Sequence, residues 1–188
     1  MAGFLKQYKS VIYGNYRKAY LLYGLYTGLI MSGYVLFMRI IILPLNAPET
    51  YGTDIAMLAA MLLFTYLYRK QLPDGKVYFK ELMLLNLGTG VIAAILYGAF
   101  LALYGNTFDT EFFNRCTETY INNMTASDKP EAEIQKIVDA YRHYTTFHWS
   151  AIGAFRSAVM SIICAFIASL VFRTEQNVVK PRPNRNGL

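Results

Sequence analysis

The chain has 188 residues, which fits one domain, and combines 55% hydrophobic residues with only 16% charged residues and a net charge of +6. Residues 19–38 and 82–108 carry no charge, and each stretch reaches the roughly twenty mostly apolar residues that a membrane-spanning helix needs. A soluble core helix is seldom apolar on all sides over such a length, which argues against a soluble domain. The basic residues form no recognition helix and accompany no aromatic RNA platform, which argues against a nucleic-acid-binding protein.

The N-terminal residues predict a lead-in segment and a first span. We expect residues 3–18 to be amphipathic, and either continuous with the first span or lying on the inner membrane surface. Tyrosines at positions 13, 16, 20 and 23 have helical spacing, which indicates an aromatic belt or, alternatively, a lipid- or partner-binding face. The first span covers 19–43 and ends before Pro44. No small-residue cleavage site follows it, so we expect a retained anchor and not a signal peptide.

Three further spans are predicted, at 52–68, 80–104 and 147–172. The sequence Leu-Pro-Asp-Gly at 72–75 has turn chemistry, because proline fixes φ and glycine tolerates a positive φ. The polar residues 175–188 predict a flexible tail behind a single membrane domain. We therefore predict an all-α polytopic membrane protein, a four-helix bundle of residues 1–174.

The two halves of this domain resemble each other. Residues 27–30, Thr-Gly-Leu-Ile, match residues 89–92, Thr-Gly-Val-Ile, and similar Tyr/Lys pairs precede both. The pattern predicts a parallel repeat of 16–70 and 78–174 about an axis along the membrane normal. Chance convergence of two hydrophobic hairpins is the alternative.

The long connection between the third and fourth spans, about 105–146, predicts a helical extracytoplasmic insert. Asp128 and Glu131 have the spacing of a capping box, with Asp128 as the N-cap and Glu131 at the third helical position. Apolar residues at 134, 137, 138 and 141 then fall on one helix face. A second amphipathic helix is expected around 108–123. Both helices are expected to cap the bundle or to lie on the membrane surface.

Basic residues predict the orientation of the chain. The N-terminal segment, the 69–81 loop and the tail hold twelve of the eighteen basic residues and only three acids. The other two connections hold four basic residues and nine acids. The positive-inside rule therefore puts both termini in the cytoplasm and residues 105–146 outside. The same basic segments predict contact with anionic lipid headgroups on the cytoplasmic side.

Small residues recur every four positions on three of the predicted spans. A period of four keeps them on one helix face, where they let two backbones approach closely. We interpret these stripes as packing faces within the bundle, with homodimer formation or another membrane-protein partner as the alternative. The positions that define them are Gly24, Gly28, Gly90, Gly98, Gly153, Ser157 and Ser161.

Three charged residues lie inside or at the edge of predicted spans. Arg39 lies close enough to the end of the first span for its head to reach the interface. Arg156 lies deeper and shares a face with the small residues of the fourth span, so we predict that it points inward and pairs with Asp54. An outer vestibule for anions lined by Arg39 and Arg156 is the alternative.

Sequence motifs for catalysis are absent. The membrane core holds no acid for a proton relay, no span contains a proline, and no hydrolase, P-loop or dinucleotide motif occurs. Asp139 and His143 could share a helix face, but two such residues give only a weak metal signal. Cys116 and Cys164 belong to different regions, so no disulfide is expected. We predict a protein that is not an enzyme and has no cofactor or metal.

The order of features resembles a known family. Tyr-Arg-Lys at 68–70 ends the second span, and Gly-Lys-Val-Tyr-Phe-Lys-Glu at 75–81 leads into the third. With the acidic insert at 124–141 and a Ser/Ala-rich last span, this pattern resembles the domain of unknown function 4199, found in membrane proteins of Bacteroidota, over residues 15–174. The stretch at 72–74 is longer than the family pattern. The resemblance implies four helices and a bacterial inner-membrane location, and no activity.

Three functions remain open at this point. The stripes and the insert favour a non-catalytic assembly, scaffold or envelope-homeostasis component. Arg39 and Arg156 favour a small channel or transporter, with anions as the expected solute. The histidines and acids of the insert weakly favour a membrane enzyme.

Overall fold

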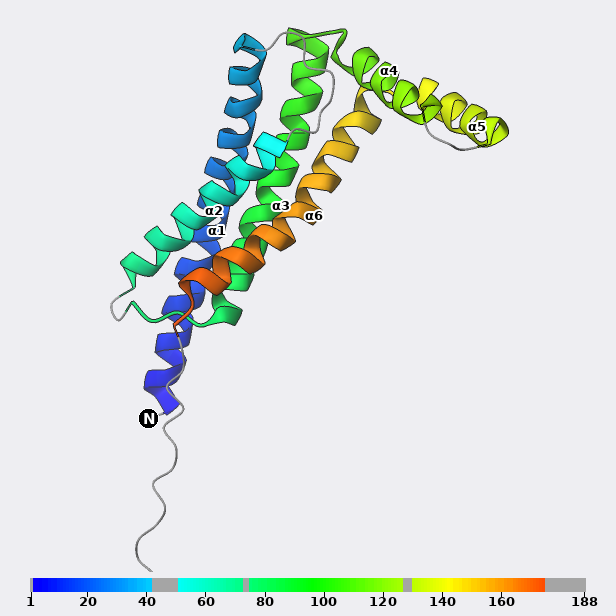
Figure 1. Cartoon of the computed structure of the whole chain (residues 1–188). Helices are drawn as coiled ribbons and strands as arrows, with labels where there is room; N and C mark the ends of the chain where they lie inside the picture. The colour runs from blue at the N-terminus through cyan, green and yellow to red at the C-terminus, as the bar shows by residue number, and fades with distance from the viewer. Residues whose placement is uncertain (1, 42–50, 73–74, 127–129, 175–188) are drawn as a thin grey trace, which may run out of the picture.

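The computed structural model describes residues 2–41, 51–72, 75–126 and 130–174, with side chains from Lys18 onward. These residues form helices and no strand (Figure 1), which confirms the all-α prediction. The elements are α1 (Ala2–Ile41), α2 (Tyr51–Gln71), α3 (Phe79–Leu103), the π-helical turn η1 (Tyr104–Phe108), α4 (Phe112–Thr125), α5 (Glu131–Arg142) and α6 (Thr146–Phe172).

Four helices are long and apolar enough to cross a membrane. They cover Lys18–Ile41, Tyr51–Gln71, Phe79–Phe108 and Thr146–Phe172. These ranges are close to the predicted spans. Residues 42 and 43, the last two of the first predicted span, lie outside the described residues. The chain is therefore a multi-pass membrane protein. Of the two predicted arrangements of residues 3–18, the structure has the continuous one, since α1 is unbroken from Ala2 and no proline precedes Pro44.

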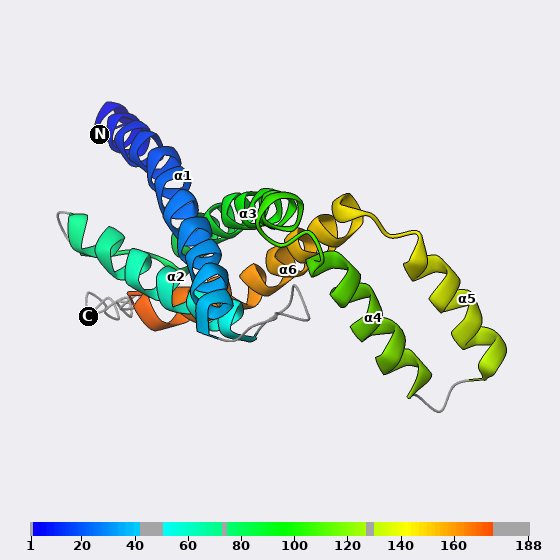
Figure 2. The same ribbon diagram turned by 90° about the horizontal axis from the view of Figure 1, so that it is seen from above.

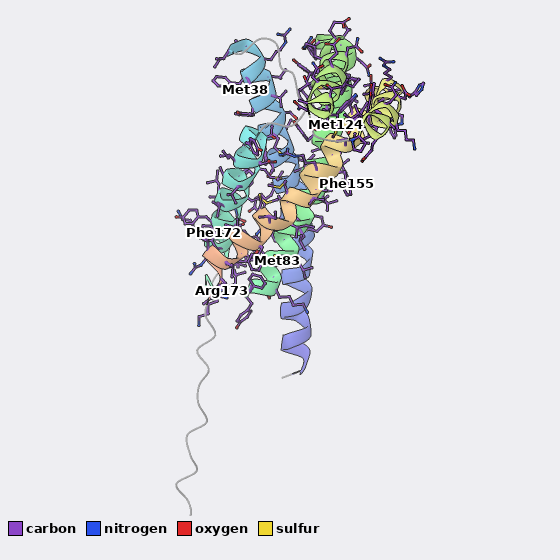
Figure 3. The ribbon with its side chains drawn as sticks, turned by 45° about the vertical axis from the view of Figure 1, so that its right-hand side comes forward. Met38, Met83, Met124, Phe155, Phe172 and Arg173 are labelled. Carbon is purple, nitrogen blue, oxygen red and sulfur yellow. The ribbon has the colours of Figure 1, made fainter. Side chains whose placement is uncertain are left out.

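The third helix lies between two neighbours. α3 packs along α1 on one side and along α6 on the other, and α2 contacts both α1 and α6 (Figures 1 and 2). Met31, Met57, Tyr97 and Leu101 fill the interior of the bundle. The outside is equally apolar: Phe155, labelled in Figure 3, is 73% exposed on α6. Apolar residues on both faces suit helices whose outer solvent is lipid.

The small-residue stripes lie at helix–helix contacts within the chain. A Cβ added to Gly24 would lie 2.6 Å from the Cβ of Ile92, and one added to Gly28 would lie 2.9 Å from the Cβ of Leu96, so α1 approaches α3 at these glycines. The other side of α3 approaches α6 in the same way. A Cβ added to Gly90 or Gly98 of α3 would overlap Ser161 or Ala154 of α6, and one added to Gly153 of α6 would overlap Leu101 of α3. Ser157 and Ser161 are also buried. Glycine and serine permit this close packing because a larger side chain would overlap its neighbour.

The predicted insert is a helical hairpin of α4 and α5. Its first helix begins four residues later than expected, because η1 prolongs the third span as far as Phe108. The capping-box prediction is wrong. The N-cap is Pro130 and Glu131 is the first helical residue, while Asp128 lies outside the described residues. A residue that precedes proline is disfavoured in the α region, which favours a start after Pro130. The carbonyl of Pro130 accepts the N–H groups of Glu133 and Ile134.

The hairpin leaves the bundle where α3 ends and α6 begins, which we call the hairpin end, and extends sideways from it (Figures 1 and 2). The predicted apolar face of α5 is turned inward, since Val138 is 6% exposed and the Tyr141 ring lies 5.7 Å from that of Tyr120 on α4. The two helices therefore pack on each other through their apolar faces and expose their charged ones.

The opposite end of the bundle is tied by the segment that follows α2. Gly75 has a φ of +57°, as the turn prediction required, and its carbonyl accepts a hydrogen bond from Arg69 Nε at 3.0 Å. Pro73 and Asp74 lie outside the described residues. Val77 then pairs with the residue after α6: the N–H of Thr174 donates to its carbonyl at 2.8 Å, and its own N–H donates to Thr174 Oγ1 at 3.1 Å. This pairing joins the loop between α2 and α3 to the end of α6.

Candidate functional site

Arg156 and Asp54 form an ion pair between α6 and α2. Nη2 of Arg156 donates to Oδ2 of Asp54 at 2.7 Å, and Nη1 donates to Oδ1 at 3.5 Å. The two side chains are 26% and 10% exposed. Asp54 lies in the first turn of α2, where the helix dipole also favours a negative charge. The structure thus brings together the two residues that the sequence suggested as partners.

A second ionic cluster, which sequence reasoning missed, surrounds Asp109. Its Oδ2 lies 2.5 Å from Nη2 of Arg115 and 3.5 Å from Nε of Arg39, and it accepts a hydrogen bond from the Tyr104 hydroxyl at 3.3 Å. Arg39 and Arg156, which the sequence placed at one vestibule, therefore pair with different acids. We call Asp109, Arg39, Arg115 and Tyr104 the Asp109 cluster.

Local backbone structure places Asp109 in this position. Its N–H donates to the carbonyl of Tyr104 at 3.0 Å and closes η1, while its own carbonyl accepts the N–H of Phe112 at 2.9 Å and starts α4. The carboxylate therefore lies at the turn where the chain changes from span to hairpin. The available sequence signal was its position, since Asp109 is the first charge after twenty-seven uncharged residues.

Aromatic rings join the hairpin to α6. The indole of Trp149 is fully buried and its ring centroid lies 5.0 Å from that of Tyr120, 5.9 Å from that of Tyr141 and 5.7 Å from that of Tyr144. Its Nε1 donates to Thr117 Oγ1 on α4 at 3.1 Å. We call Tyr120, Tyr141, Tyr144 and Trp149 the aromatic root. It fixes both hairpin helices to the start of α6.

A polar network that the sequence did not predict crosses the bundle interior. Asn86 on α3 is 2% exposed. Its Oδ1 accepts from the Thr65 hydroxyl on α2 at 2.9 Å, and its Nδ2 donates to Ser169 Oγ on α6 at 3.4 Å. Such bonds hold three helices at a fixed register, because an unpaired amide in an apolar interior is unfavourable.

Asp139, one residue of the weak metal signal, has another partner, and the other residue, His143, is exposed at the end of α5. The imidazole of His148 stacks on Tyr144, and its Nδ1 lies 3.2 Å from the N–H and 2.9 Å from the hydroxyl of Thr145, at the start of α6. Asp139 accepts a hydrogen bond from Gln135 at 3.1 Å. Within the described ranges, no three His, Cys, Asp or Glu side chains are grouped as metal ligands would be. Cys116 and Cys164 are both buried, and neither forms a disulfide.

The family model described as "Protein of unknown function (DUF4199)" matches residues 22–174, which include the hairpin and nearly all of the four spans. The chain belongs to the DUF4199 family. No curated protein and no solved structure matches this DUF4199 chain at a significant level. The resemblance predicted from the sequence is confirmed, and the family assigns no activity to the ionic clusters, the aromatic root or the interior network.

Proposed function

We propose that this protein is a non-catalytic membrane component, of the assembly, scaffold or envelope-homeostasis kind, that presents the α4–α5 hairpin to a protein partner. One observation carries the proposal: the hairpin extends beyond the bundle and is fixed to it on two sides. The Asp109 cluster holds the turn where α4 begins, and Trp149 holds both helices at the start of α6. Buried contacts of this kind give the hairpin a fixed direction, which suits a binding element.

The charge of the hairpin suggests the kind of partner. Residues 109–146 contain seven acids and four basic residues, a net charge of −3. Of the described acids on α4 and α5, those at 118, 131, 133 and 139 are exposed. A surface of this sign repels anionic headgroups and favours a basic protein surface. In the proposed orientation the hairpin lies outside the cytoplasmic membrane, and both termini lie in the cytoplasm next to anionic lipids.

The pairing of Arg156 weighs against the anion channel. An anion path needs cationic groups that face the permeating ion along the bundle, whereas Arg156, the deeper of the two arginines, is paired with Asp54. The small-residue stripes are occupied within the chain, which removes the main support for a homodimer through these faces. We therefore favour a different protein as the partner, bound through the hairpin.

Photo-crosslinking in the native host tests this proposal. A photoreactive residue replaces Ala132 or Ala140, both exposed on α5, and Leu29, which is 64% exposed on the bundle, serves as the control position. We expect a protein adduct of one mass from both α5 positions and not from position 29. The adduct should disappear when Glu131 and Glu133 are both changed to lysine.

A second assay separates the alternative function. The purified chain is reconstituted in liposomes, and chloride efflux is compared with that of empty vesicles. Saturable efflux that Arg156→Gln abolishes, together with no hairpin adduct, would replace the scaffold proposal by a channel.

A further inference from the structure

We propose that the guanidinium group of Arg39 binds the phosphate of a phospholipid headgroup at the hairpin end of the bundle. The inference is independent of the proposed function, since it concerns the surface of the span and not the hairpin. Two arginines share the single carboxylate of Asp109, and they do so unequally. The carboxylate lies 2.5 Å from Arg115 and 3.5 Å, the longer distance, from Arg39. A charge-assisted hydrogen bond normally measures about 2.7–2.9 Å, so Arg115 is the closer partner and Arg39 is left with most of its bonding capacity.

The donors of Arg39 that remain are accessible. A guanidinium carries five N–H groups, and Nε is the nitrogen of Arg39 that lies closest to Asp109. Its terminal nitrogens have no acceptor among the described residues. The side chain is 32% exposed, compared with 5% for Asp109. The buried carboxylate therefore holds the guanidinium in place from behind while its outer edge stays open. A planar fork of donors in this arrangement matches the oxygens of a phosphate group.

The depth of the site favours a lipid as the source of the phosphate. Arg39 lies in the last turn of its span, and Asp109 directly follows the last residue of another. Both residues are thus at the boundary between the apolar spans and the polar segments, where headgroups lie. The neighbours of Arg39 in the chain face outward, since Leu36 is 39% exposed and Ile40 is 78% exposed. Phe108, beside Asp109, is 67% exposed. A phosphate bound here would have its acyl chains next to apolar side chains.

Native mass spectrometry of the detergent-purified chain tests the site. The titrants are phosphatidylglycerol, a diacylglycerol with the same chains and no phosphate, and inorganic phosphate. We expect retention of phosphatidylglycerol by the native chain and at least tenfold weaker retention by Arg39→Gln, because bonds to a charged group are lost. Arg142→Gln, which removes an exposed arginine from α5, is the matched control and should bind as the native chain does. Arg39→Lys keeps the positive charge beside Asp109, so it serves as the second variant if Arg39→Gln does not fold. We expect it to bind phosphatidylglycerol several-fold more weakly than the native chain does.

Three results would overturn the proposal. Equal retention of phosphatidylglycerol by the native chain, Arg39→Gln and Arg39→Lys would show that Arg39 is not the binding group. Equal retention of diacylglycerol and phosphatidylglycerol by the native chain would mean that the acyl chains, and not the phosphate, are recognised. Displacement of phosphatidylglycerol by millimolar inorganic phosphate would identify free phosphate as the ligand in place of a lipid.

Discussion

The ion pair between Arg156 and Asp54 makes a quantitative prediction about stability. Replacing Arg156 by leucine leaves Asp54 without its partner, and only 10% of that side chain is exposed. Two unit charges about 4 Å apart attract by about 4 kcal/mol at an effective dielectric constant of about 20. Removing one member of a buried pair costs about 3–5 kcal/mol. Because Arg156 is 26% exposed and partly solvated, we expect about 2–3 kcal/mol for Arg156→Leu.

The second half of the cycle separates the pair from its surroundings. Asp54→Asn in the Arg156→Leu background removes the unpaired charge. The loss of unfolding free energy in the double variant should therefore be about 1–2 kcal/mol smaller than the sum of the losses in the two single variants. Reversible unfolding of the purified chain in mixed micelles, with SDS as the denaturant and helix content by circular dichroism as the readout, gives the four free energies. Losses that add within about 0.5 kcal/mol would refute the coupling and with it the structural role of the pair.

Three further predictions follow from the bundle, the orientation and the aromatic root. Gly98→Leu should lower the free energy of unfolding by about 1–3 kcal/mol through overpacking against Ala154, while Ala99→Leu on the exposed face of α3 should be nearly neutral, and equal effects would show that the stripe is not a packing face. In a background without the two native cysteines, an impermeant thiol reagent added to intact cells should label a cysteine at position 127 and not one at position 75, and labelling at 75 would reverse the topology. Trp149→Phe removes the bond to Thr117, so amide hydrogen exchange in α4 should rise by about fivefold or more, with no change in α2; unchanged exchange in α4 would mean that the indole N–H does not hold the hairpin.

Hydropathy was sufficient to predict the spans, because a helix in lipid must satisfy its backbone within itself and cover about 30 Å with apolar side chains. The partner of Arg156 was also accessible, since the period of four in the last span fixes which face turns inward. The start of the hairpin could not be predicted from the sequence, because the π-helical turn at residues 104–108 depends on tertiary contacts. Its ring contacts include Tyr104 against Phe112, at a centroid distance of 5.2 Å. A periodicity argument contains no such information.

Polar residues were the hardest to predict, and the reason is the same in each case. Asn86 and Asp109 lie next to apolar sequence, where a single polar residue gives no periodic signal. Their partners come from other helices. The Asn86 amide bonds to Thr65 and Ser169, and the Asp109 carboxylate contacts Arg39 of α1 and Arg115 of α4. A pairing between helices depends on the rotation of each helix, which the composition of one helix does not determine.

The ionic contacts and the close helix packing lie in different parts of the molecule and differ in their sensitivity to salt. The ion pairs of Asp54 and Asp109 lie toward the hairpin end, whereas the interface of α1 with α3 rests on glycines packed against Ile92 and Leu96. Ionic contacts near the headgroups are weakened by salt, but close packing inside the bilayer is not. High salt should therefore loosen the Asp109 cluster, which holds the turn into α4, before it affects the interface of α1 with α3. A binding element whose direction depends in part on the Asp109 carboxylate can be loosened while the membrane anchor stays folded.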